Sequence, residues 1–88
     1  MSRPIREIES DLADAKLAEL RALAVEDTVR ERNALPEFLS AARKHYLASC
    51  RRVAALHNEL RKAQQEQQEW LNQAQAFLKR ERSKEVKP

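Results

Sequence analysis

The sequence predicts an all-α protein, folded as an antiparallel helical hairpin whose second helix is much longer than its first. The 88-residue chain contains no glycine, and its prolines lie at Pro4, Pro36 and Pro88. Strong helix formers dominate the composition, and apolar residues recur at helical spacing on both sides of Pro36. A chain this short forms one domain with a small core. We therefore expect dimerisation through coiled-coil packing to add stability.

The first helix is expected at about residues 4–32. Pro4 suits a first helical turn, and acidic residues crowd the early turns, where they favour the positive end of the helix dipole. Two alternatives remain open: a later start capped by Ser10, and a break where Thr28 and Glu31 match a capping box. The large apolar residues share a sector of about 120° at 100° per residue. They are Ile5, Ile8, Leu12, Leu20 and Leu23.

Residues 33–36 form the one predicted turn, because the residue before Pro36 is pushed out of helical geometry and the proline can open a new helix. The second helix is expected at about residues 37–82, followed by a frayed charged tail at 83–88. A helix of about 45 residues is roughly 68 Å long. Its a and d positions follow one another at alternating steps of three and four. They are Leu39, Ala42, Tyr46, Ser49, Val53, Leu56, Leu60, Ala63, Gln67, Trp70, Ala74 and Phe77.

In this hairpin we expect Leu12 to face Leu56 or His57 and Leu20 to face Ser49, with the start of the first helix near Gln64. The second helix therefore continues without a partner in its own chain. The continuation carries an apolar stripe that we name by its five residues: Trp70, Leu71, Ala74, Phe77 and Leu78. Leaving four large side chains in water is unfavourable, so we expect the apolar stripe to bind a second copy or another protein. Tryptophan is enriched among the residues that anchor such interfaces.

Charge is distributed unevenly along the chain. Residues 1–34 hold six Lys/Arg against eight Asp/Glu, whereas residues 35–65 hold six against two. Four of these cations form a basic tract: Arg43, Lys44, Arg51 and Arg52. One interpretation is that the basic second helix pairs with the acidic first helix. The alternative is attraction to nucleic acid, for which the sequence offers little aromatic interleaving beyond Tyr46.

The sequence predicts no catalytic, metal or cofactor site. His45, Cys50 and His57 are the only candidates, and none of their spacings is the i, i+3 or i, i+4 that joins two ligands on one helix. Glycine-rich phosphate loops are excluded by the composition. The single cysteine fits a reducing cytoplasm, and no apolar run indicates a signal peptide or a membrane span.

These features favour a non-enzymatic protein-interaction module, such as an adaptor, a chaperone or an inhibitor-type regulator. A nucleic-acid-associated hairpin that uses the basic tract is the second hypothesis. A structural coiled-coil subunit of a larger assembly is the third. The sequence leaves open the partner, the biological process, whether the apolar stripe makes a homodimer or a hetero-complex, and the orientation of a dimer.

Overall fold

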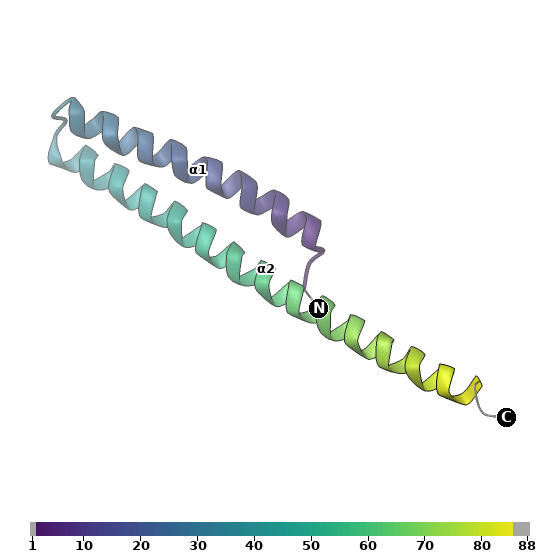
Figure 1. Ribbon diagram of the computed structural model, residues 1–88. Coiled ribbons are helices and arrows are strands. Elements are labelled where there is room, and N and C mark those ends of the chain that lie inside the picture. Colours follow the sequence, from purple (N-terminus) through teal and green to yellow (C-terminus); the bar gives the residue numbers. More distant parts are fainter. Residues whose placement is uncertain (1, 86–88) are drawn as a thin grey trace.

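The computed structural model describes residues 2–85, and these form two helices. Helix α1 spans Ile5–Glu31 and helix α2 spans Pro36–Glu85, a length of 50 residues. Figure 1 shows the helices side by side, joined by a short turn at one end, with the C-terminal part of α2 continuing beyond the start of α1. The longest dimension is 83 Å. The prediction of an all-α hairpin with a long second helix is confirmed.

Helix α1 begins and ends without interruption. Pro4 is the residue before its first turn, and its carbonyl accepts hydrogen bonds from the Glu7 and Ile8 N–H groups. The start capped by Ser10 is therefore wrong. The break at Thr28 is also wrong, because the Thr28 hydroxyl donates to the Ala24 carbonyl at 2.9 Å inside a continuous helix. Helix α2 runs through 83–85, so the tail predicted from residue 83 starts too early. Residues 86–88 lie outside the described part.

The turn ends α1 with a Schellman motif. The Asn33 N–H donates to the Arg30 carbonyl and the Ala34 N–H donates to the Val29 carbonyl, both at 3.2 Å. Asn33 has φ 49°, in the left-handed region that asparagine tolerates better than most residues. Pro36 then opens α2, and the Leu35 carbonyl accepts the first two hydrogen bonds of the new helix.

Position 33 therefore offers a test of this turn. We expect Asn33→Gly to stabilise the hairpin and Asn33→Ala to destabilise it by about 1 kcal/mol, because a Cβ without a polar group is disfavoured at positive φ. For a domain of this size that is a shift of about 4–8 °C in the melting temperature. Thermal unfolding followed by circular dichroism measures both. An alanine variant as stable as the glycine variant would contradict the left-handed geometry.

The core runs between the two helices, and its largest side chains lie in the half of the hairpin away from the turn. Its central cluster joins Leu12 and Ala15 of α1 to Val53 and Leu56 of α2, with Leu60 packed against it. On α2, every predicted a and d position before the extension is buried or half-buried. These positions are Leu39, Ala42, Tyr46, Ser49, Val53, Leu56, Leu60 and Ala63.

On α1, part of the predicted apolar sector is wrong. Leu20 is 64% exposed and Leu23 is 37% exposed, so the expected pairing of Leu20 with Ser49 does not form the core. The buried positions continue from Ile8 and Leu12 at alternating steps of three and four instead. They include Ala15, Ala22 and Glu26. Helix α1 has to follow the same spacing as α2 to stay in contact with it, and this brings small residues inward and rotates Leu20 and Leu23 outward.

Candidate partner-binding surface

The N-terminal segment fixes α1 to α2 at the open end of the hairpin. The Arg3 guanidinium donates to both carboxylate oxygens of Glu59, at 2.7 and 3.0 Å. It also donates to Asp11 at 2.7 Å and to Glu7 at 3.1 Å. These bonds, with that to Glu59 the strongest influence, raise the pKa of Arg3 above its ordinary value. Arg3 therefore links the start of α1 to the middle of α2.

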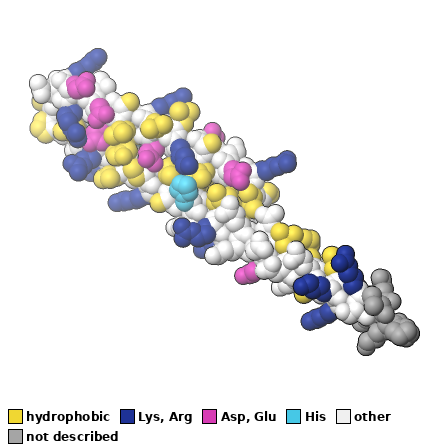
Figure 2. All heavy atoms as spheres, viewed as in Figure 1, with side chains coloured by type: hydrophobic (Ala, Val, Ile, Leu, Met, Phe, Trp, Pro, Cys, Tyr) yellow, Lys and Arg dark blue, Asp and Glu magenta, His cyan; other side chains and the backbone are white. Residues whose placement is uncertain are grey.

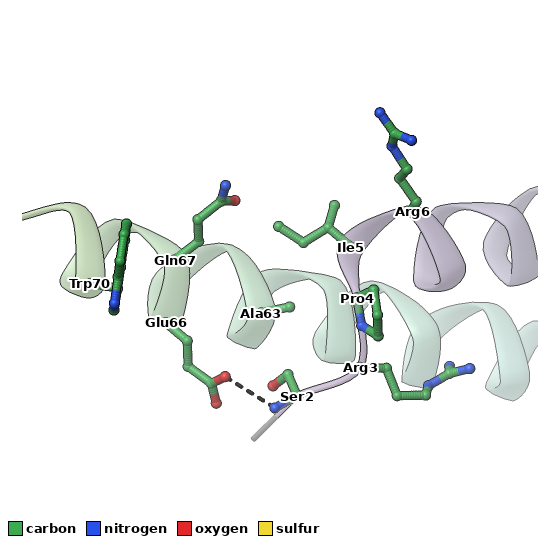
Figure 3. Close-up of a pocket in the computed structure, with 9 residues that line it drawn as sticks. All are labelled: Ser2, Arg3, Pro4, Ile5, Arg6, Ala63, Glu66, Gln67 and Trp70. Carbon is green, nitrogen blue, oxygen red and sulfur yellow. Dashed lines mark hydrogen bonds between the residues drawn. The ribbon is translucent and has the colours of Figure 1, made fainter.

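Two turns further along α2, at Glu66, the same segment borders a surface hollow. The Ser2 backbone N–H donates to Oε2 of Glu66 at 3.2 Å. The hollow has a volume of about 480 Å³ and is lined by residues 2–6 together with Ala63, Glu66, Gln67 and Trp70. In Figure 3, Ile5 points from the start of α1 toward Gln67 of α2, whereas Arg6 points away from α2. The sequence did not predict this contact, because Ser2 and Glu66 are 64 residues apart and no pattern links them.

The contacts at Glu59 and Glu66 predict that the open end of the hairpin becomes less stable in acid. The hydrogen bond from Arg3 lowers the pKa of Glu59 below its ordinary value of 4.5, and hydrogen bonds from Ser2 lower the pKa of Glu66. A carboxylate with a lowered pKa in the folded state contributes stability that is present above pH 4.5 and is lost as the pH falls through the folded-state pKa.

We therefore expect the melting temperature to decrease as the pH is lowered past 4.5. The variant Arg3→Gln should be less stable near neutral pH, and its melting temperature should depend less on pH. Calorimetry between pH 3 and pH 7, over the range of ordinary carboxyl pKa values, measures both effects. The matched control is Arg6→Gln, which removes a neighbouring exposed arginine. An acid dependence of equal steepness in the wild type and in Arg3→Gln would contradict a role for this ion pair.

The extension, which we define as residues 67–85 of α2, carries the apolar stripe outside the hairpin core. Trp70 is 66% exposed, Phe77 is 61% exposed and Leu78 is 60% exposed. Leu71 is also exposed, whereas Ala74 is half-buried among the larger side chains of its own helix. Figure 2 shows apolar side chains gathered on this part of the molecule, next to a group of Lys and Arg side chains. Trp70 lies where the stripe meets the hollow.

The basic tract is exposed along α2. All four side chains are exposed, and none lies within 4 Å of a carboxylate among the described residues. The ion pair that crosses between the helices instead joins a cation near α1, Arg3, to an anion of α2, Glu59. The tract is not confined to one face, because Lys44 and Arg51 are at f positions and Arg43 and Arg52 flank the seam on opposite sides.

The remaining candidates for chemistry lie apart from the extension. Cys50 is half-buried, and its thiol, close to Tyr46, raises the pKa of the Tyr46 phenol, with smaller effects from partial burial and from the carboxylates of Glu19 and Glu26. Among the described residues, no three His, Cys, Asp or Glu side chains are grouped as metal ligands. Within residues 2–85 we find no helical stretch apolar and long enough to cross a membrane.

Comparison with protein-family models, curated proteins and solved structures finds no significant match to this chain. The proposals below therefore depend on the residues themselves.

Proposed function

We propose that this chain is a non-enzymatic protein-interaction module that binds a protein surface through the apolar stripe of α2. The observation that carries the proposal is the exposure of Trp70, Leu71, Phe77 and Leu78 on an extension that α1 does not cover. Four large apolar side chains along one helix face are the pattern of a helix that packs into a groove or against another helix. An adaptor, a chaperone or an inhibitor-type regulator fits this description, and the single Cys50 supports a reducing, cytoplasmic setting.

Association of the apolar stripe is stabilised by the apolar surface that it removes from water. Fully burying one large apolar side chain contributes about 1.5–3 kcal/mol. The hairpin alone gains little stability from these side chains, because they lie outside its core cluster and stay largely exposed. Substituting them should therefore change binding and leave the hairpin folded.

The test is affinity capture from the native cell with the wild-type chain and with Trp70→Ala/Phe77→Ala. Phe38→Ala is a matched control, because Phe38 is 60% exposed, as Phe77 is, but lies beside the turn. We expect the stripe variant to lose the proteins that the wild type and Phe38→Ala retain, or to lose self-association. Identical captured proteins and an identical oligomeric state for all three chains would overturn the proposal.

The basic tract supports a second candidate function, binding of a nucleic-acid backbone. The supporting observation is that Arg43, Lys44, Arg51 and Arg52 are exposed without a carboxylate nearby. Binding of this kind weakens steeply as salt rises. A salt-sensitive shift of an oligonucleotide that disappears when the four residues are replaced by Gln would favour this candidate over the apolar stripe.

A further inference from the structure

We infer that the apolar stripe is covered by the extension of a second copy, in an antiparallel pair whose two-fold axis passes beside Ala74. This inference rests on the proposed function and specifies its partner and geometry. Three properties of the extension support it: the order of its apolar residues, the order of its charges, and the flank on which two of those charges lie.

The apolar stripe has the same pattern in both directions from Ala74. Large side chains lie three and four residues before it, at Leu71 and Trp70, and three and four residues after it, at Phe77 and Leu78. A second copy running in the opposite direction therefore brings Trp70 level with Leu78 and Leu71 level with Phe77. Ala74 meets Ala74 at the centre, where a small residue allows the two helices to approach closely.

The charges of the extension have opposite signs on the two sides of Ala74. Glu66, just before the extension, and Glu69 precede it, whereas four basic residues follow it against two acidic ones: Lys79, Arg80, Arg82 and Lys84 against Glu81 and Glu85. An antiparallel pair brings the acidic side of each copy level with the basic side of the other. A parallel pair in register would bring like charges together, which is unfavourable. Charge complementarity thus favours a second copy in the antiparallel orientation.

Two of these charges lie on the same flank of the apolar stripe. Glu66 and Arg80 are fourteen residues apart, which is two heptads, so both occupy g positions. In an antiparallel pair the g flank of one helix faces the g flank of the other. With Ala74 at the centre, Arg80 of the second copy is offset from Glu66 by two residues, about 3 Å along the axis, which its long side chain can span, and symmetry repeats the contact. Glu66 already accepts the Ser2 N–H through Oε2, which holds its side chain on the surface of α2.

The apolar stripe is also continuous with the hollow at the open end of the hairpin. Trp70 borders both the stripe and the hollow, whose apolar lining includes Pro4, Ile5 and Ala63. The end of α2 from the second copy, running back past Trp70 and Gln67, lies beside this lining. The same pairing thus covers apolar surface on the extension and at the start of α1.

A charge-exchange series tests the orientation. Glu66→Arg and Arg80→Glu should each weaken the dimer about tenfold in Kd at low salt, because each turns two attractive contacts into repulsive ones. The double variant Glu66→Arg/Arg80→Glu should restore the wild-type Kd within about twofold, since it exchanges the charges and keeps the net charge. Sedimentation equilibrium measures all four chains. A double variant weaker than both single variants would overturn the antiparallel pairing.

Disulfide mapping provides an independent measurement. In a Cys50→Ser background, Gln67→Cys and Glu81→Cys lie equally far from Ala74 on the same side of the helix. The antiparallel pair predicts a disulfide when the two variants are mixed, and none within either variant alone, where the cysteines are about 21 Å apart along the axis. Disulfides within each variant alone would indicate a parallel pair and overturn the inference.

These outcomes separate the inference from the proposed function. A chain that remains monomeric at all concentrations, yet loses captured proteins in Trp70→Ala/Phe77→Ala, overturns the second copy and retains the binding surface. A monomeric chain in which that double substitution has no effect on capture overturns both.

Discussion

Replacing Leu56 by alanine is expected to lower the free energy of unfolding by about 2–5 kcal/mol, the range for truncating a buried leucine. Leu56 is 7% exposed and lies in the cluster that joins the helices through Leu12, Ala15 and Val53. Small domains are stabilised by about 5–15 kcal/mol in total, and this core is thin. The substitution should therefore remove a large part of the total stability.

Chemical denaturation followed by circular dichroism measures this effect, with Leu20→Ala as the matched control. Leu20 is 64% exposed on α1, so its truncation should change stability by no more than about 0.5 kcal/mol. A loss at Leu20 as large as that at Leu56 would contradict the packing described above, and would place Leu20 in the contact between the helices.

Replacing both Trp70 and Phe77 by alanine is expected to weaken association by at least about 100-fold. Each truncation removes about 1.5–3 kcal/mol of the binding free energy that burial of the large side chain contributes. A loss of about 1.4 kcal/mol corresponds to a factor of ten in Kd. Helix content and melting temperature of the monomer should stay close to wild type, because neither side chain belongs to the core cluster.

Sedimentation velocity over a concentration series measures this loss, with Phe38→Ala as the control for truncating an exposed phenylalanine. A change in both association and monomer stability would indicate that the extension supports the hairpin itself. An unchanged sedimentation profile would mean that the apolar stripe is not the self-association surface.

The architecture of α2 could be predicted from the sequence because its pattern is strong and local. The a and d positions from Leu39 to Ala63, apolar except for Ser49, follow one another at steps of three and four, and the structure buries or half-buries each of them. Pro36 marks the start of the helix, since proline is favoured at a first helical position. The unequal lengths of the two helices follow from the position of the turn, and they predict the extension.

The packed face of α1 could not be predicted from the sizes of its side chains. Leu20 and Leu23 are larger than Ala22, and Glu26 is charged, yet Ala22 and Glu26 are buried. Glu26 is tolerated there because Arg30 donates a hydrogen bond to it at 2.9 Å. The buried face is set by the register against α2, which is tertiary information.

The contacts of Arg3 were equally hidden in the sequence. One arginine before a proline is an ordinary surface feature, and Glu59 is separated from it by most of the chain. Only the folded hairpin brings them to 2.7 Å. The hollow beside Trp70 depends on the same arrangement, so the sequence predicted the apolar stripe but not its continuation to the start of α1.

The fluorescence of Trp70 tests the central claim most directly, because it is the only tryptophan in the chain and lies on the proposed surface. The measurement is a dilution series of the wild-type chain. If association buries the apolar stripe, Trp70 at high protein concentration should emit at shorter wavelength and be quenched only weakly by acrylamide. Dilution should move both toward the values of a solvent-exposed indole. Emission and quenching of a solvent-exposed indole at every concentration would contradict the claim that a second copy covers this surface.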